Sequence, residues 1–177
     1  MGIALIIIDM QRFVTDRIAK GYESHPFNAI DNMRKILCSF RQRNKKIIHV
    51  RHQTVEEDSY LHINSILSHP IEGFEEENGE PIFVKKTSSA FRSTDLLTYL
   101  KENDIDECIF IGAVAGFCLS STVRDGADLG LKASVVSDAI ISFELLNEKI
   151  KAKEILDVTL AVLNADFAKV ISSIELI

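Results

Sequence analysis

The feature that most constrains the fold is an unbroken aliphatic run near the start of the chain. Residues 3–8 read Ile-Ala-Leu-Ile-Ile-Ile, with no polar position that would face solvent. A strand with one solvated face alternates polar and apolar residues, so a continuous apolar run is typical of a strand covered on both faces. Such strands occur in parallel sheets that lie between helices, and this run therefore predicts an α/β protein.

The rest of the chain alternates short apolar runs with segments of helical periodicity. Further strands are expected at residues 46–50, 82–84, 107–111, 132–136 and 170–174, and helices at about 26–43, 93–102, 118–129 and 147–163. This alternation predicts a Rossmann-like, three-layer α/β/α architecture with a central, mostly parallel six-stranded sheet. The length suits one domain that spans residues 1–177.

Composition excludes several classes of partner. The net charge of −6 argues against nucleic acid, because phosphate binding requires a basic face. No run of about 18 apolar residues predicts a membrane span, and the N-terminal residues lack the pattern of a signal peptide. The three cysteines are an odd number without paired spacing, which favours a reducing compartment, and we expect a cytoplasmic protein.

Three reactive residues follow predicted strands. Asp9 follows the first strand, Lys85 follows residues 82–84, and Cys118 follows the strand at 107–111 after a glycine-containing turn. Ligands of open parallel sheets bind at the carboxyl ends of the strands, so these three side chains are expected to meet there. Lys86 is a rival of Lys85 for this position.

Cys118 is the candidate nucleophile. It is expected where a strand turns into a helix, and the N–H groups and dipole of a helix N-terminus favour a thiolate. Lys85 is expected to lower the pKa of the thiol further and to hold Asp9 ionised, while Asp9 takes the thiol proton and passes it to a leaving amine. The competing interpretation is a buried structural cysteine, which is common.

The chain resembles the isochorismatase-like cysteine hydrolases, a superfamily that includes nicotinamidases. The matching stretches are Ile6–Gln11 with the catalytic aspartate, Lys85 four residues before Ser89-Ala90-Phe91, Gly112–Cys118 with Thr122 and Asp125, and Val135–Ala139. The motif spacing favours Lys85 over Lys86 as the catalytic lysine. The sequence departs from the usual family pattern at Ser88, Gly116 and Gly126.

The resemblance implies a mechanism. Cys118 attacks a small amide, a thioester forms as ammonia or an amine leaves, and water activated by Asp9 releases the acid. It also implies a cis peptide bond between Ala113 and Val114, which would turn the N–H of Val114 toward that of Cys118. These two backbone donors would form the oxyanion hole.

The residues near the triad are candidates for the substrate pocket. We expect Phe13, His52, Phe91 and Phe117 to line it, although ordinary core packing is an equal alternative for each aromatic ring. The Asp-x-His element of the metal-binding nicotinamidases is missing, so we expect neither a bound metal nor a cofactor. His52, His62 and His69 leave a metal site as the alternative.

Three functions remain open at this point. An amidohydrolase uses all three reactive residues, an isochorismatase-type vinyl-ether hydrolase does not require the cysteine, and a catalytically silent binding or scaffold protein would keep the fold alone. The expected partner is a small-molecule substrate. Since relatives are commonly dimers or tetramers, the resemblance also implies a homodimer or homotetramer.

Overall fold

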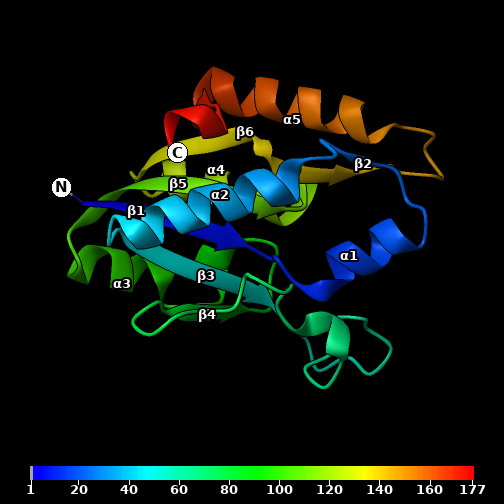
Figure 1. Cartoon of the computed structure of the whole chain (residues 1–177), viewed down its shortest axis with the longest axis horizontal. Coiled ribbons are helices and arrows are strands. Elements are labelled where there is room, and N and C mark those ends of the chain that lie inside the picture. The colour runs from blue at the N-terminus through cyan, green and yellow to red at the C-terminus, as the bar shows by residue number, and fades with distance from the viewer. Residues whose placement is uncertain (1) are drawn as a thin grey trace.

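A single sheet with helices on both faces forms the core of the computed structural model, which describes residues 2–177. The strands are β1 (Gly2–Ile8), β2 (Ser24–His25), β3 (Lys46–His52), β4 (Ile82–Lys85), β5 (Ile105–Ala113), β6 (Lys132–Phe143) and β7 (Lys169–Ile171). The helices are α1 (Arg12–Ala19), α2 (Ala29–Gln42), α3 (Leu96–Glu102), α4 (Ser120–Asp128) and α5 (Ala152–Asp166). Figure 1 shows β1 in the middle of the sheet with α2 lying over it.

The sheet confirms the expected topology. Neighbouring strands follow the order β6-β5-β1-β3-β4, with β7 on the outer side of β6, and all of these pairs are parallel. The two-residue strand β2 adds one antiparallel pair at the far end of β6. The mostly parallel six-stranded sheet is therefore present, and β2 is a seventh strand that the sequence did not indicate.

Two apolar cores separate the layers. The face of the sheet under α1 and α2 packs the side chains of Val14, Met33, Ile36 and Leu37. The other face packs α3, α4 and α5 through residues that include Leu100, Val123, Leu156 and Leu163. Residues 4–8 of the aliphatic run in β1 are buried between both cores, which is why they include no polar position, and Ile3 at the start of the run is exposed.

Some element boundaries differ from those predicted. Helix α1, with only eight residues and polar positions among its apolar ones, was not predicted. The helix expected from residue 26 begins at Ala29, because residues 26–28 form the bend and turn that precede it. The C-terminal helix begins at Ala152 and not at residue 147, since the residues before it form a turn closed by Leu145 and Ile150.

The long segment 53–81 is irregular and lies beside α1. It is held at its C-terminal end by Glu80, whose carboxylate accepts a hydrogen bond from Arg41 Nε at 2.8 Å and lies 2.7 Å from His49 Nε2. In residues 2–177, no helix has the length and apolar character needed to cross a bilayer. The oligomeric state stays a prediction; Val158 and Val162 are exposed on α5.

Candidate active site

The carboxyl ends of three strands bring Asp9, Lys85 and Cys118 together. Asp9 follows β1, Lys85 is the last residue of β4, and Cys118 lies in the turn between β5 and α4. The ammonium nitrogen of Lys85 is 2.9 Å from Asp9 Oδ2 and 3.1 Å from Cys118 Sγ. One buried lysine thus contacts both the candidate base and the candidate nucleophile.

Backbone geometry aims the Asp9 carboxylate into this site. Asp9 has φ +51°, the left-handed region, and its N–H donates to the carbonyl of Val50 on β3. The side chain is buried, and Oδ2 is paired with Lys85. Oδ1 has no hydrogen-bond partner among the residues that the structure describes. That oxygen is therefore free to accept a proton from a thiol or a water.

The turn that carries Cys118 is closely packed against β1. Gly112 has φ +124°, and a Cβ there would lie 2.1 Å from the carbonyl oxygen of Ile8. The next peptide bond, between Ala113 and Val114, is cis, as the resemblance implies. Thr122 then fixes the cysteine from the following helix by donating from Oγ1 to the Cys118 carbonyl at 2.7 Å.

Burial, and next the charge of Asp9, raise the pKa of the Cys118 thiol to about 11, while Lys85 opposes them. The expectation of a lowered thiol pKa is therefore wrong for the resting site. The argument from the helix N-terminus considered only local backbone, whereas a desolvated thiolate beside a carboxylate is disfavoured. Cys118 rests as a neutral thiol that needs a base, and Asp9 is the carboxylate beside it.

The same surroundings control the other two titrating groups. Burial raises the pKa of Asp9, and the nearby Lys85 partly offsets this by favouring the carboxylate. Burial, and then Lys85, lower the pKa of His52, so its imidazole is neutral at pH 7. His52 Nδ1 lies 3.2 Å from Lys85 Nζ and 3.8 Å from Cys118 Sγ, which makes it an acceptor for the ammonium.

The donor atoms also bear on the question of a metal. Asp9, His52 and Cys118 place a carboxylate oxygen, a ring nitrogen and a sulfur within 4.8 Å of one another, and no other such group occurs among residues 2–177. Lys85 Nζ lies within 3.2 Å of an atom of each residue. An ammonium there repels a divalent cation, so these residues do not fit a metal, and His62 and His69 do not join the group.

A cavity of about 270 Å³ opens onto Asp9 and Cys118. Three of the four expected pocket residues, Phe13, His52 and Phe117, line it. Val114, expected as an oxyanion-hole donor, also lines it. Residues that the sequence analysis did not place in the pocket line it as well: Arg17, Tyr60, Leu61, Ser88, Phe143, Glu144 and Leu145. Most of them come from α1, the 53–81 segment and the end of β6, whose approach to the site depends on tertiary structure.

Phe91 does not line this cavity, which corrects its expected placement. The ring packs against α4, where a Cβ at Gly126 would lie 3.2 Å from Phe91 Cε2. Phe91 also belongs to the residues packed on the core of that face. The glycine that departs from the family pattern therefore leaves room for this ring, and the aromatic residue is structural.

Gln11 is a positioning residue whose role the sequence analysis missed. It is fully buried, and its amide donates to the carbonyls of His52 at 2.9 Å and Ser68 at 2.6 Å. Its Oε1 accepts the N–H of His52 at 2.8 Å. Gln11 thereby ties the end of β3 to the irregular segment and fixes His52 beside Lys85.

Comparison with known proteins decides the family. The model of the isochorismatase domain matches residues 3–173, nearly the whole chain. The chain belongs to the isochorismatase family. The structure provides the α/β/α fold of that family and contains Cys118 at the strand-to-helix turn that the resemblance assigns to the nucleophile.

Relatives of this isochorismatase-family protein match it over almost their full length. An uncharacterized isochorismatase family protein of Bacillus subtilis, YrdC, is 29% identical over 98% of this chain and 94% of its own. A solved isochorismatase-family structure from Chromobacterium violaceum has a TM-score of 0.91 at 26% identity, covering 98% and 91% of the two chains. An isochorismatase from Pseudomonas putida has a TM-score of 0.84 at 27% identity, covering 99% and 90%.

The high thiol pKa of this isochorismatase-family site predicts a specific response to alkylation. Iodoacetamide modification of Cys118, followed by mass spectrometry, should accelerate about tenfold per pH unit up to pH 9 without a plateau. Asp9→Asn should speed the reaction at pH 8, because it removes a charge that raises the thiol pKa. Lys85→Met should slow it, because it removes a charge that lowers that pKa.

Exposed Cys38 on α2 provides an internal reference in the same spectra. Its alkylation rate should be the same in all three proteins, since it lies outside the site. A Cys118 profile that reaches a plateau near pH 7, or one that both substitutions leave unchanged, would contradict the electrostatic coupling described above.

Proposed function

We propose that this protein is a cysteine-dependent amidohydrolase that cleaves the C–N bond of a small amide. The observation that carries the proposal is the position of Lys85 Nζ, 2.9 Å from Asp9 Oδ2 and 3.1 Å from Cys118 Sγ. This arrangement provides a nucleophile, a carboxylate base with one free oxygen, and a cation that stabilises the ionised base. A cysteine that only packs in the core does not require a buried lysine and a carboxylate beside its sulfur.

In the first half-reaction, Asp9 accepts the thiol proton as Cys118 Sγ bonds to the amide carbon. The resulting oxyanion accepts hydrogen bonds from the backbone N–H groups proposed for the oxyanion hole, those of Val114 and Cys118. The C–N bond then breaks, and the proton held by Asp9 leaves with the ammonia or amine. The enzyme is left as a thioester with Asp9 again ionised.

In the second half-reaction, Asp9 takes a proton from water, whose oxygen attacks the thioester carbon. The C–S bond breaks, the acid is released, and the proton returns to the sulfur. The raised pKa of Asp9 suits this work, because it makes the carboxylate a stronger base toward the thiol and the water. Neutral His52 keeps Lys85 directed at the site through its Nδ1.

The cavity has a size that suits a small substrate. Its volume of about 270 Å³ is below the range of about 300–1,000 Å³ typical of sites for larger ligands. We therefore propose a small-molecule substrate as the partner. The four phenylalanine and tyrosine rings that line the cavity, those of Phe13, Tyr60, Phe117 and Phe143, provide apolar walls beside the reacting atoms.

The test is detection of the thioester. Incubation with a panel of small primary amides should release ammonia, and mass spectrometry of acid-quenched protein should locate an acyl group on Cys118. Cys118→Ala should lower ammonia release at least about a thousandfold, as removal of a catalytic nucleophile does elsewhere. Ammonia release that survives this substitution would overturn the proposal.

Isochorismatase-type vinyl-ether hydrolysis is a second candidate function, because some relatives are named isochorismatases. One of them is the secreted isochorismatase effector Isc1 of Verticillium dahliae, which is 26% identical over 96% of this chain. That chemistry needs a proton donor and no thioester. It would therefore persist in Cys118→Ala and disappear in Asp9→Asn. The two substitutions thus separate the two reactions, and a protein inactive in both assays would be a binding or scaffold member.

A further inference from the structure

Arg17 is a cation of the active-site cavity that has no anionic partner. It lies in the last turn of α1 and lines both the cavity of Cys118 and a neighbouring pocket of about 260 Å³. Among the described residues, its side chain forms no ion pair and no hydrogen bond, and its buried Nε has no acceptor. A guanidinium left without an acceptor in a cleft points to a ligand that supplies one.

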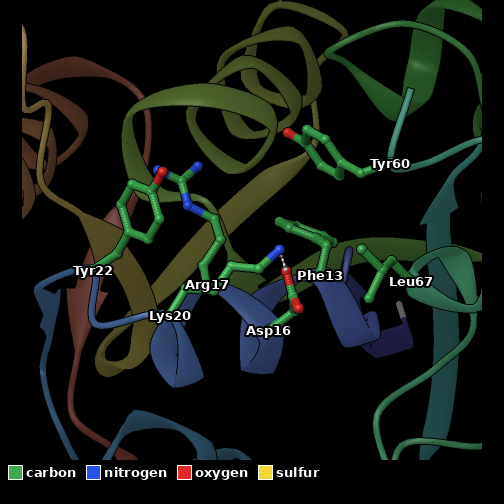
Figure 2. Close-up of a pocket in the computed structure, with 7 residues that line it drawn as sticks. All are labelled: Phe13, Asp16, Arg17, Lys20, Tyr22, Tyr60 and Leu67. Atoms are coloured by element: carbon green, nitrogen blue, oxygen red, sulfur yellow. Dashed lines mark hydrogen bonds and ion pairs between the residues drawn. The ribbon is translucent and has the colours of Figure 1, made fainter. Parts of the chain in front are cut away.

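Aromatic rings hold this guanidinium in place. Its central carbon lies 4.7 Å from the ring centre of Tyr22 and 4.7 Å from that of Phe143. Figure 2 shows the Arg17 head group beside Tyr22, with Phe13 and Tyr60 on the other side of the pocket. Stacking covers the faces of a guanidinium and leaves its edge, where the N–H donors are, for a planar anion.

The other charged side chains of the two pockets are paired. Asp9 is paired with Lys85, Asp16 with Lys20 at 2.7 Å, and Glu144 with the N–H of Glu23 at 2.9 Å and with Lys151 Nζ at 3.5 Å. In Figure 2 the dashed line joins Lys20 to Asp16, and none reaches Arg17. The local carboxylates therefore do not neutralise this arginine.

We propose that Arg17 binds a carboxylate of the substrate, so that the enzyme acts on small amides that also carry an acidic group. The proposal rests on the proposed function, since it names the substrate class of the same site. Arg17 and Cys118 line one cavity of about 270 Å³, so one small molecule can reach both. The planar fork of arginine binds both oxygens of a carboxylate, which also orients the amide end toward Cys118.

The first test measures binding of benzoate and benzamide, which differ in charge but share a ring, to Cys118→Ala protein by calorimetry. Benzoate should bind at least about tenfold tighter than benzamide, the gain expected from a charge-assisted contact. Arg17→Met should remove this preference, and Arg17→Lys should restore part of it. Arg12→Met is the matched control, because Arg12 lies on the same helix, is exposed, and its side chain donates a hydrogen bond only to the Pro70 carbonyl.

The second test uses the reactive cysteine of the full protein. Iodoacetate is anionic and iodoacetamide is neutral, so the ratio of their rates at Cys118 reports a cation in the cavity. Arg17→Met should lower this ratio about tenfold with the iodoacetamide rate unchanged, which also shows that the site is folded. Equal effects on both reagents, or equal benzoate binding with and without Arg17, would overturn the assignment and leave Arg17 as a packing residue.

The outcomes separate this inference from the proposed function. Carboxylate binding that depends on Arg17, without a thioester on Cys118, would reject the amidohydrolase and keep the anion site. A thioester that forms at the same rate with or without a carboxylate on the amide, and with or without Arg17, would keep the amidohydrolase and reject the anion site.

Discussion

Lys85→Met is expected to lower turnover at least about a thousandfold while the protein stays folded, since general-base catalysis contributes about 10²–10⁴-fold. The ammonium of Lys85 has acceptors in Asp9, Cys118, His52 and the Thr87 carbonyl, and its side chain has 0% exposure. Without it, the strongest influence that favours the Asp9 carboxylate is lost, and burial raises the pKa of Asp9 further.

The fold should survive because a buried carboxylate whose pKa is raised can take up a proton and need not remain as an unpaired charge. Methionine also keeps an unbranched chain of similar length in the same space. The diagnostic readout is the pH profile of kcat/KM. The acidic limb, which reports ionisation of Asp9, should move to higher pH in the variant, because the cation that favours the carboxylate is gone.

Lys86→Met is the matched control. Lys86 is the next residue, is exposed, and contributes its backbone N–H to Ser93 Oγ at 2.9 Å, a bond that the substitution leaves in place. Its turnover and pH profile should be those of the unmodified enzyme. Equal losses of turnover in the two variants would show that Lys85 acts only through the net charge of the protein. Unchanged turnover in Lys85→Met would reject its role at the site.

Gly112→Ala is expected to destabilise the fold by more than about 4 kcal/mol, which places it among the most damaging single substitutions. The new Cβ would lie 2.1 Å from the carbonyl oxygen of Ile8 and 2.8 Å from its nitrogen. Both are backbone atoms of the central strand β1, where Ile8 pairs with Gly112. The clash is therefore with the main chain, and the rotation of a side chain cannot relieve it. In a domain of this size, the melting temperature should fall by about 10 °C or more.

Gly130→Ala separates this clash from the cost of backbone conformation. Gly130 also has positive φ, +87°, but nothing lies within 4 Å of a Cβ built there. It should lose only about 1–2 kcal/mol, the cost of a left-handed conformation for an L-residue. If Gly112→Ala yields no soluble protein while Gly130→Ala folds, the clash is supported; similar melting temperatures in the two variants would contradict it.

The sheet could be predicted from the sequence because its buried strands contain continuous apolar runs that can be recognised without their neighbours. Continuous apolar runs such as those of β1 and β5 require burial on both faces, and that requirement holds whatever surrounds them. The reactive residues Asp9, Lys85 and Cys118 could be placed together for a related reason. Parallel strands end at the same edge, so residues that follow them must converge there.

Features that depend on distant segments could not be predicted in this way. Arg17 reaches the cavity from a short helix that lacks a strong apolar pattern, and Tyr60 comes from an irregular segment. Phe91 is near Lys85 in sequence, yet it packs on Gly126. The direction of the Cys118 pKa shift also depends on total burial and on Asp9, neither of which the neighbouring residues reveal.

The place of β1 in the sheet has a consequence for synthesis on the ribosome. Ile8 pairs with Val50 on one side and with Gly112 on the other. The strand that contains Gly112 is therefore synthesised about a hundred residues after Ile8. Until β5 emerges, a long aliphatic strand has one open edge, which is the kind of surface that aggregates or recruits chaperones. Cys118 follows β5 in the chain, so a nascent chain assembles its thiol site only after β5 has been made and can pair with the second edge of β1. A chain that stalls before that point exposes the open edge of β1 and has no active site.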